Sequence, residues 1–124
     1  MTVPAKQKLI YLCSPFTHKD PEVMRNREEV VTAIAAGLTE RYGYAMFLPI
    51  TQSAPMERIN PNLKGDFESW KSIDLFMVRE KCDELWVVLM DGWRESVGVA
   101  AEIREADVNG IPIRFYDPIE SRFV

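Results

Sequence analysis

A chain of 124 residues, with 47% hydrophobic and 27% charged residues, has the length of one domain and the balance of a globular protein. Its net charge of −4 and pI near 5.0 argue against a basic surface for a nucleic acid polymer. The apolar stretch near the N-terminus is too short for a membrane span or a signal-peptide core. We therefore expect a single cytoplasmic domain over residues 1–124 that does not bind membranes.

The first half of the chain predicts a strand, a long helix and a second strand. An apolar run at 8–13 predicts a buried strand, which ends at a loop containing two prolines. Over 21–41, apolar residues recur at helical spacing, a proline suits the first turn and a glycine follows the end. Residues 44–50 predict a second strand. The stretch 51–65 has two more prolines and no clear period, which predicts a long loop.

The second half continues the alternation of strands and helices. A helix is expected over 66–81, with an aspartate as its cap, and the apolar run at 83–90 is the strongest strand signal. Ser96 suits the N-cap of a further helix over 97–109, which a glycine ends, and 111–116 predicts the last strand before a polar tail. Such β-α units indicate a parallel sheet with helices on both faces and ligands at the carboxyl ends of its strands.

Glu102 is the first candidate functional residue, because its own helix offers no partner for its charge. One turn away lie only Gly98, Val99, Glu105 and Ala106. Burying an unpaired carboxylate costs roughly several kcal/mol unless the group protonates or takes part in chemistry. Gly98 would also leave room for a ligand beside the backbone. The alternatives are that Glu102 points to solvent or pairs with an arginine from elsewhere in the fold.

Asp74 repeats this pattern on the preceding helix. Apolar residues surround it at helical spacing, and only Lys71 is placed to pair with it. Two such carboxylates can act as a nucleophile and as a proton donor or orienting group, the division of roles that cleaves glycosidic bonds. Because the loops after the strands at 8–13 and 83–90 open at one edge of a parallel sheet, we expect both acids to share one cleft.

Further candidates for substrate binding lie in the loops beside this cleft. They are Ser14, Phe16, Thr17 and His18 after the first strand, and Trp93 before the Ser96 cap. Trp93 could stack on a base, or it could fill the core. His18 could act as an acid or bind phosphate, or it could be an ordinary surface histidine.

Missing motifs exclude several classes of site. Cys13 and Cys82 belong to no CxxC or Cys/His cluster, which indicates buried free thiols rather than a disulfide or a zinc site. Neither GxGxxG nor GxxxxGK[ST] occurs, which disfavours a dinucleotide site or an ATP-hydrolysing site.

The segments "IYLCSPF", "DFESWKSIDLFMVREKCDELWVV" and "DGWRESVGVAAEI", in this order, resemble the nucleoside deoxyribosyltransferase superfamily, which includes the 2'-deoxynucleoside 5'-phosphate N-hydrolases. They are most similar to an uncharacterised bacterial and phage branch of it. The resemblance spans nearly the whole chain. It implies a single-domain, doubly wound sheet of four to five strands, flavodoxin-like and Rossmann-like, and cleavage of the bond between a base and its sugar.

The resemblance also implies roles for individual residues. Glu102 matches the glutamate that attacks the anomeric carbon, Tyr11 matches a tyrosine that positions the nucleophile and the sugar, and Asp74 matches an aspartate that assists the base or orients the site. Ser96 matches a phosphate-binding serine of the nucleotide hydrolases, which favours hydrolysis. The loop "SPFTHKD" departs from the glycine- and arginine-containing phosphate loop of those hydrolases. Members also complete their sites with a neighbouring subunit, which implies a homodimer or a larger homo-oligomer.

We therefore expect an N-glycosidase of nucleosides or nucleoside 5'-monophosphates, with no metal and no organic cofactor. A base-exchanging deoxyribosyltransferase and a non-catalytic nucleotide-binding module are alternatives on the same fold. A structural or oligomerisation protein is a third, in which Glu102 meets a cation across a subunit interface.

Overall fold

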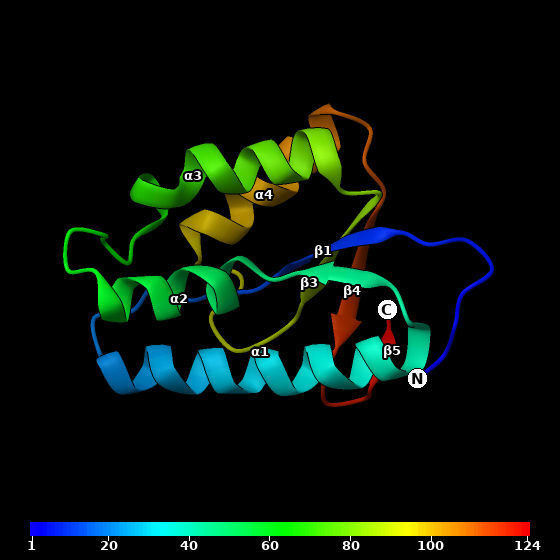
Figure 1. The fold of residues 1–124 in the computed structure, drawn as a ribbon, viewed down its shortest axis with the longest axis horizontal. Helices are drawn as coiled ribbons and strands as arrows, with labels where there is room; N and C mark the ends of the chain where they lie inside the picture. Colours follow the sequence, from blue (N-terminus) through cyan, green and yellow to red (C-terminus); the bar gives the residue numbers. More distant parts are fainter.

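The computed structural model describes residues 1–124, and its centre is a five-stranded sheet with the strand order β2-β1-β3-β4-β5 (Figure 1). β1 to β4 run parallel, and β5 pairs with β4 in the antiparallel direction. The protein is thus of the α/β class, with a mostly parallel sheet, as expected. The strands are β1 (Leu9–Cys13), β2 (Ala45–Phe47), β3 (Glu84–Val88), β4 (Ile113–Asp117) and β5 (Arg122–Phe123).

Helices lie on both sides of this sheet, with α1 on one side and α3 and α4 on the other in Figure 1. The core has two parts, because alternate residues of a strand point to opposite faces. Ile10 and Leu12 pack with side chains of α1 and α2, whereas Tyr11 and Cys13 pack with side chains of η1 and α4. The helical segments are α1 (Pro21–Tyr42), α2 (Pro49–Ile59), α3 (Phe67–Phe76), the π-helical turn η1 (Met77–Lys81) and α4 (Val97–Val108).

The sheet order places β1 and β3 side by side at its centre, with Tyr11 opposite Leu85 and Cys13 opposite Val87. Because the two strands are parallel, their following loops open at the same edge of the sheet. α4 begins at this edge, where Ser96 caps it by accepting a hydrogen bond from the Val99 backbone N–H at 3.2 Å. The cap predicted from the sequence is confirmed.

The prediction of a loop over 51–65 is wrong in its first part, because α2 occupies Pro49–Ile59. This helix also makes the second strand, β2, shorter than the predicted 44–50. Pro49 suits a first helical turn, since its fixed φ is already helical. Ile50 and Ala54, at i and i+4, pack into the core that α1 covers. Pro55, inside the helix, provides no N–H for a helical hydrogen bond, so the packing of this face outweighs that loss.

The other differences fall at the ends of elements. The helix predicted over 66–81 is confirmed with its Asp66 cap, but its last turn, η1, is π-helical. The polar tail contains β5, whose two residues were too short a signal to predict. No helix in the structure combines the length and the apolar character needed to cross a membrane.

Candidate active site

Glu102 is buried, with 4% of its surface exposed, and two neutral donors of β1 hold its carboxylate. The Tyr11 hydroxyl donates to Oε2 at 2.5 Å and the Cys13 thiol donates to Oε1 at 3.2 Å. These donors lie two residues apart on β1 and therefore point to the same face of the sheet. Glu102 forms no ion pair in this chain, so neither alternative, a solvated side chain or an arginine from elsewhere in the fold, is found.

The surroundings of Glu102 favour its neutral form. Burial, above all, and the nearby charge of Asp74 raise the pKa of Glu102 from 4.5 to about 8, although the hydrogen bonds from Tyr11 and Cys13 act in the opposite direction. Burial, and then the charge of Glu102, raise the pKa of Tyr11 and of Cys13 well above their usual range. Both groups therefore stay protonated at neutral pH and remain donors to the carboxylate.

Asp74 faces Glu102 from α3 and is also buried, with 8% of its surface exposed. Its carboxyl forms no ion pair, because Lys71, the one candidate on its own helix, pairs with Glu68 at 2.9 Å. Burial raises the pKa of Asp74 from 3.8 to about 6. The site thus contains two buried carboxyl groups whose pKa values both lie near neutrality, a frequent property of catalytic acids.

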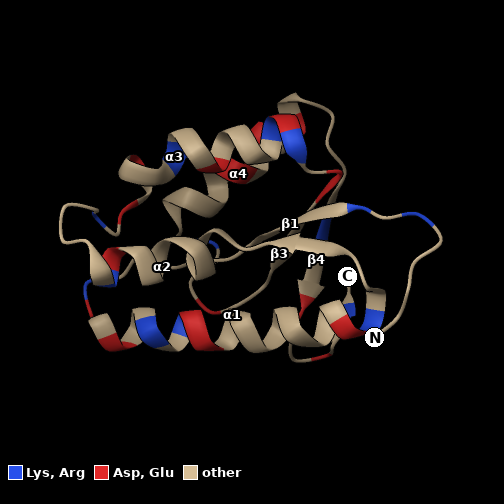
Figure 2. Ribbon diagram, viewed as in Figure 1, with Lys and Arg blue, Asp and Glu red and all other residues tan.

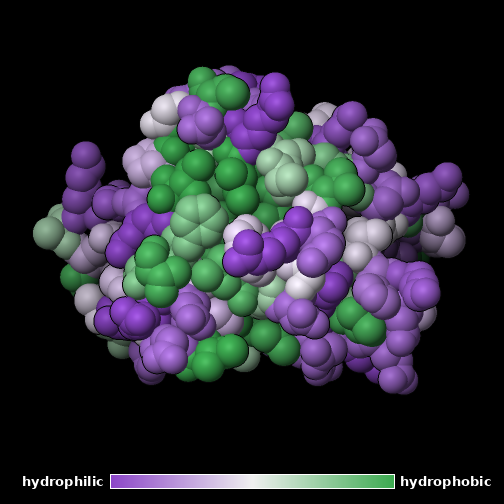
Figure 3. Space-filling model, turned by 180° about the vertical axis from the view of Figure 1, so that it is seen from behind, coloured by the Kyte–Doolittle hydropathy of each residue, from purple (hydrophilic) through white to green (hydrophobic).

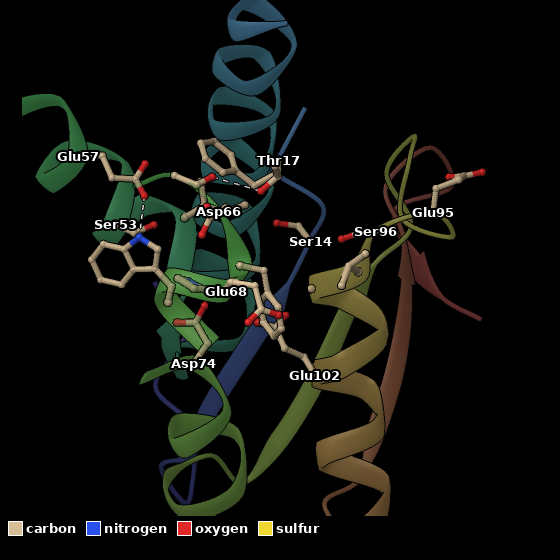
Figure 4. Close-up of a pocket in the computed structure, with 18 residues that line it drawn as sticks. Ser14, Thr17, Ser53, Glu57, Asp66, Glu68, Asp74, Glu95, Ser96 and Glu102 are labelled. Carbon is tan, nitrogen blue, oxygen red and sulfur yellow. Dashed lines mark hydrogen bonds between the residues drawn. The ribbon is translucent and has the colours of Figure 1, made fainter. Parts of the chain in front are cut away.

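A cavity of about 400 Å³ brings these acids together, as Figure 4 shows. Six carboxylates line it and no lysine or arginine does; they are Glu57, Asp66, Glu68, Asp74, Glu95 and Glu102. The sequence-predicted residues Ser14, Phe16, Thr17, Ser96 and Gly98 also line this cavity. Tyr11 is fully buried behind Glu102 and acts on the cavity through that carboxylate.

A second cavity, of about 380 Å³, adjoins the first and shares Thr17, Glu95 and Ser96 with it. It holds His18, whose Nδ1 accepts a hydrogen bond from the backbone N–H of Asp20, and Arg27, the one arginine in either wall. The Arg27 guanidinium donates to the carbonyls of Phe16 and Thr17 at 3.3 and 3.2 Å. His18 therefore lies beside the main cavity and not in it.

Trp93 lies outside both cavities, and Gly98 also packs on a neighbouring helix. Trp93 lines neither cavity; it packs on Phe115, with ring centroids 6.1 Å apart, and Arg94 covers its ring. The ring is partly buried and packs against the core on this side of the sheet. Gly98 lines the main cavity, but in the direction of its missing Cβ it faces the Phe67 ring, from which a Cβ would lie 3.2 Å away. Gly98 thus lets α3 pack closely on α4.

Sequence analysis missed Ser53 and Glu57, which line the cavity from α2, and Arg27 in the second cavity. The residues Ile50, Ser53, Ala54 and Glu57 recur at helical spacing, and this was the available signal. Pro55 within the same stretch obscured it, because a proline inside a helical pattern normally ends the helix.

The fold and the site together define an α/β protein with two buried carboxyl groups in a cavity at the carboxyl edge of its sheet. Residues 8–118 match the model of a family described as a domain of unknown function, DUF1937, and the chain belongs to this family. No curated protein matches the sequence. No group of three or more His, Cys, Asp or Glu side chains is arranged to hold a metal ion.

Proposed function

We propose that this protein is an N-glycosidase that hydrolyses the base-sugar bond of a nucleoside or nucleoside 5'-monophosphate, with Glu102 as the nucleophile. The observation that carries the proposal is the Glu102 carboxylate, buried without a cation, held by Tyr11 and Cys13, and sharing a cavity with Asp74. A carboxylate with only a structural role in this position would lower the stability of the fold, because its charge is buried without a partner. A nucleophile that forms an ester loses this charge during the reaction.

In the first step, a Glu102 oxygen forms a bond to C1' of the sugar while the C1'–N bond breaks. The electron pair of the broken bond passes to the base nitrogen, and Asp74, as a carboxylic acid, gives its proton to the departing base. The hydrogen bond from Tyr11 holds the attacking carboxylate in place. The products of this step are the free base and a glycosyl ester of Glu102.

In the second step, water gives a proton to the Asp74 carboxylate and its oxygen attacks C1'. The ester bond breaks, and Glu102 recovers its charge while Asp74 recovers its proton. If a second base attacked in place of water, the same residues would carry out base exchange, so a deoxyribosyltransferase remains the alternative within this chemistry.

The strand order of the sheet supports a substrate bound at the carboxyl edge, beside β1 and β3. The strand order 2-1-3-4-5 is that of doubly wound, flavodoxin-like proteins, in which ligands bind at the switch point between β1 and β3. We therefore propose that the fold is doubly wound and flavodoxin-like. The antiparallel direction of β5 is the departure from an all-parallel order.

The second cavity favours a nucleoside 5'-monophosphate over a nucleoside. Arg27 is the one arginine in either wall, and Ser96 lies where the two cavities meet at the start of α4. A helix N-terminus and a guanidinium both favour a phosphate group. A sugar held at Glu102 would then extend its 5'-phosphate towards Ser96 and Arg27.

The proposal extends to location and partners. Two buried free cysteines, Cys13 and Cys82, are typical of a reducing compartment, which supports the cytoplasm. Basic and acidic residues are both spread over the helices in Figure 2, which supports a small ligand over a nucleic acid polymer. A contiguous apolar area on the face shown in Figure 3 supports a homodimer or larger homo-oligomer.

The test is base release from ribonucleosides, deoxyribonucleosides and their 5'-monophosphates by the wild type and by Glu102→Ala, each shown to be folded. The proposal predicts release by the wild type that the substitution abolishes, with monophosphates preferred. Binding of nucleotides by a folded wild type with no base released from any of them would overturn catalysis and leave the nucleotide-binding module. A Glu102→Ala protein that loses its oligomeric state, with neither binding nor release in the wild type, would indicate the structural role.

A further inference from the structure

The cavity has a recognition end that the proposed reaction does not use. Figure 4 shows Ser53 and Glu57 at one end of the cavity, and Glu95 and Ser96 at the other, with Glu102 reaching in from α4. Ser53 and Glu57 lie at i and i+4 on α2 and hence on one face of that helix. Neither residue contributes to the glycosidase chemistry above.

Ser53 is an unpartnered polar group directed to the cavity. It is 8% exposed, it lines the cavity wall, and its hydroxyl makes no hydrogen bond within the protein. A buried hydroxyl without a partner costs free energy, and no buried side-chain atom of this chain is fully enclosed and unsatisfied. The Ser53 hydroxyl is therefore reached from the cavity, where a ligand or water can satisfy it.

The Glu57 carboxylate has one oxygen in a hydrogen bond and one oxygen without a hydrogen bond. The Trp70 indole N–H donates to Oε2 at 2.8 Å, whereas Oε1 accepts no hydrogen bond. The neighbouring cation does not neutralise Glu57, because Arg58 pairs with Glu28 at 2.9 Å. Oε1 lies close to the backbone of Gly65, since a Cβ on that residue would be 2.9 Å from it. The free oxygen is thus a positioned acceptor with no donor of its own.

The geometry points to α2 as the element that selects the base: Glu57, assisted by Ser53, takes a nucleobase whose edge carries an exocyclic amino group. An amino group donates to a carboxylate oxygen, whereas a keto oxygen in its place would face that oxygen with no proton between them. This inference rests on the proposed function, since it places the base at the α2 end when the sugar lies at Glu102. It assigns to Glu57 and Ser53 a role in specificity and none in bond cleavage.

The first experiment compares pairs of substrates that differ in this group: cytidine against uridine 5'-monophosphate, and adenosine against inosine 5'-monophosphate, in ribo and deoxyribo forms. One hydrogen bond to a charged group corresponds to a preference of about 10- to 100-fold in kcat/KM for the amino substrate of the preferred pair. Glu57→Gln, whose amide can donate to a keto oxygen, should reduce this ratio to near one. A merely structural role would lower both rates together and leave the ratio unchanged.

Two further variants separate position from charge. Gly65→Ala keeps the Glu57 charge but displaces Oε1, so it should also reduce the ratio; the backbone of Gly65 does not have a positive φ, and alanine is tolerated there. Glu120→Gln removes a carboxylate that is exposed and lines neither cavity, and should leave the ratio as in the wild type. Equal rates for both members of every pair in the wild type would overturn the inference and leave the glycosidase proposal intact.

Binding distinguishes this inference from the glycosidase proposal if no base is released. Equilibrium dialysis of the same monophosphates with wild-type and Glu57→Gln protein then measures discrimination directly. Tighter binding of amino than of keto nucleotides, lost in Glu57→Gln, would support base selection by α2 while the glycosidase proposal fails. Equal binding of both kinds, or no binding, would overturn base selection as well.

Discussion

Tyr11 on β1 and Glu102 on α4 are 91 positions apart in the sequence, yet the hydroxyl of one donates to the carboxylate of the other at 2.5 Å. Cys13 is the only other donor to this carboxylate. Neutral groups alone therefore contact the Glu102 carboxyl, and no cation of this chain is paired with it.

Tyr11→Phe should weaken this support without removing the nucleophile. The loss of one hydrogen bond to a charged group raises the pKa of Glu102 above about 8 and reduces kcat by about 10- to 100-fold. The measurement is kcat for base release as a function of pH, in which the limb assigned to Glu102 should move to higher pH. A variant with unchanged kcat and pH profile would show that Tyr11 does not support the nucleophile.

The pH dependence of kcat/KM should be bell-shaped and should separate the two acids. The proposed reaction needs Glu102 ionised and Asp74 protonated, although the pKa values are about 8 and about 6. The population of this form rises with pH up to about 6, is level to about 8, and falls above that. Asp74→Asn removes the requirement for an acid, so its lower activity should rise up to about 8 and then stay level. Retention of the falling limb in Asp74→Asn would exclude Asp74 as the proton donor.

Glu102→Gln should be more stable than the wild type at high pH, in contrast to its loss of activity. The pKa of Glu102 is raised from 4.5 to about 8 in the folded state, so its contribution to stability is fully present below about 4.5 and is lost as pH rises through about 8. The glutamine variant lacks this loss. Its advantage in the free energy of unfolding should grow by up to about 1.4 kcal/mol per pH unit across that window.

Urea denaturation of both proteins at about pH 5, 7 and 9 measures this difference. Asp74 titrates in the same direction and is present in both proteins, so the part of its contribution that comes from its own burial is common to both. A constant difference at all three values would mean that the Glu102 carboxyl is not raised in pKa by the fold.

Arg27→Gln tests the second cavity. Glutamine removes the positive charge and, being shorter than arginine, also weakens the contact with the carbonyls of Phe16 and Thr17, so the effect on nucleosides measures the loss of that contact. We expect KM for nucleoside 5'-monophosphates to rise by about tenfold or more, with little change for nucleosides. Equal effects on both kinds of substrate would indicate that Arg27 shapes the loop and does not bind phosphate.

Much of the fold and part of the site could be predicted from local patterns. The order of strands and helices follows from apolar periodicity, and the caps Asp66 and Ser96 follow from residue type. Glu102 and Asp74 stand out because their own helices provide no usable cation, a property visible within one turn. These signals are short-range, which is why one sequence suffices to find them.

The remainder depends on contacts between distant segments. Trp93 had two acceptable environments, and its contact with Phe115 of β4 depends on how the strands are placed in the sheet. The helix α2 forms around Pro55 because Ile50 and Ala54 reach a core built by other elements. Glu57 could be recognised as a positioned acceptor only after Trp70 was seen to occupy one of its oxygens. Tertiary packing, in these cases, overrides local propensity.

The shared wall of the two cavities, which Thr17, Glu95 and Ser96 form, has a consequence for the release of products. A nucleotide that spans both cavities would bind through its base and through its phosphate, and each contact would raise the effective concentration of the other group at its own site. Cleavage of the base-sugar bond divides that ligand into two independent molecules, and each then binds through its own contacts alone. The protein would therefore have a lower affinity for the two products than for the nucleotide. An equimolar mixture of free base and sugar phosphate should compete poorly with the intact nucleotide.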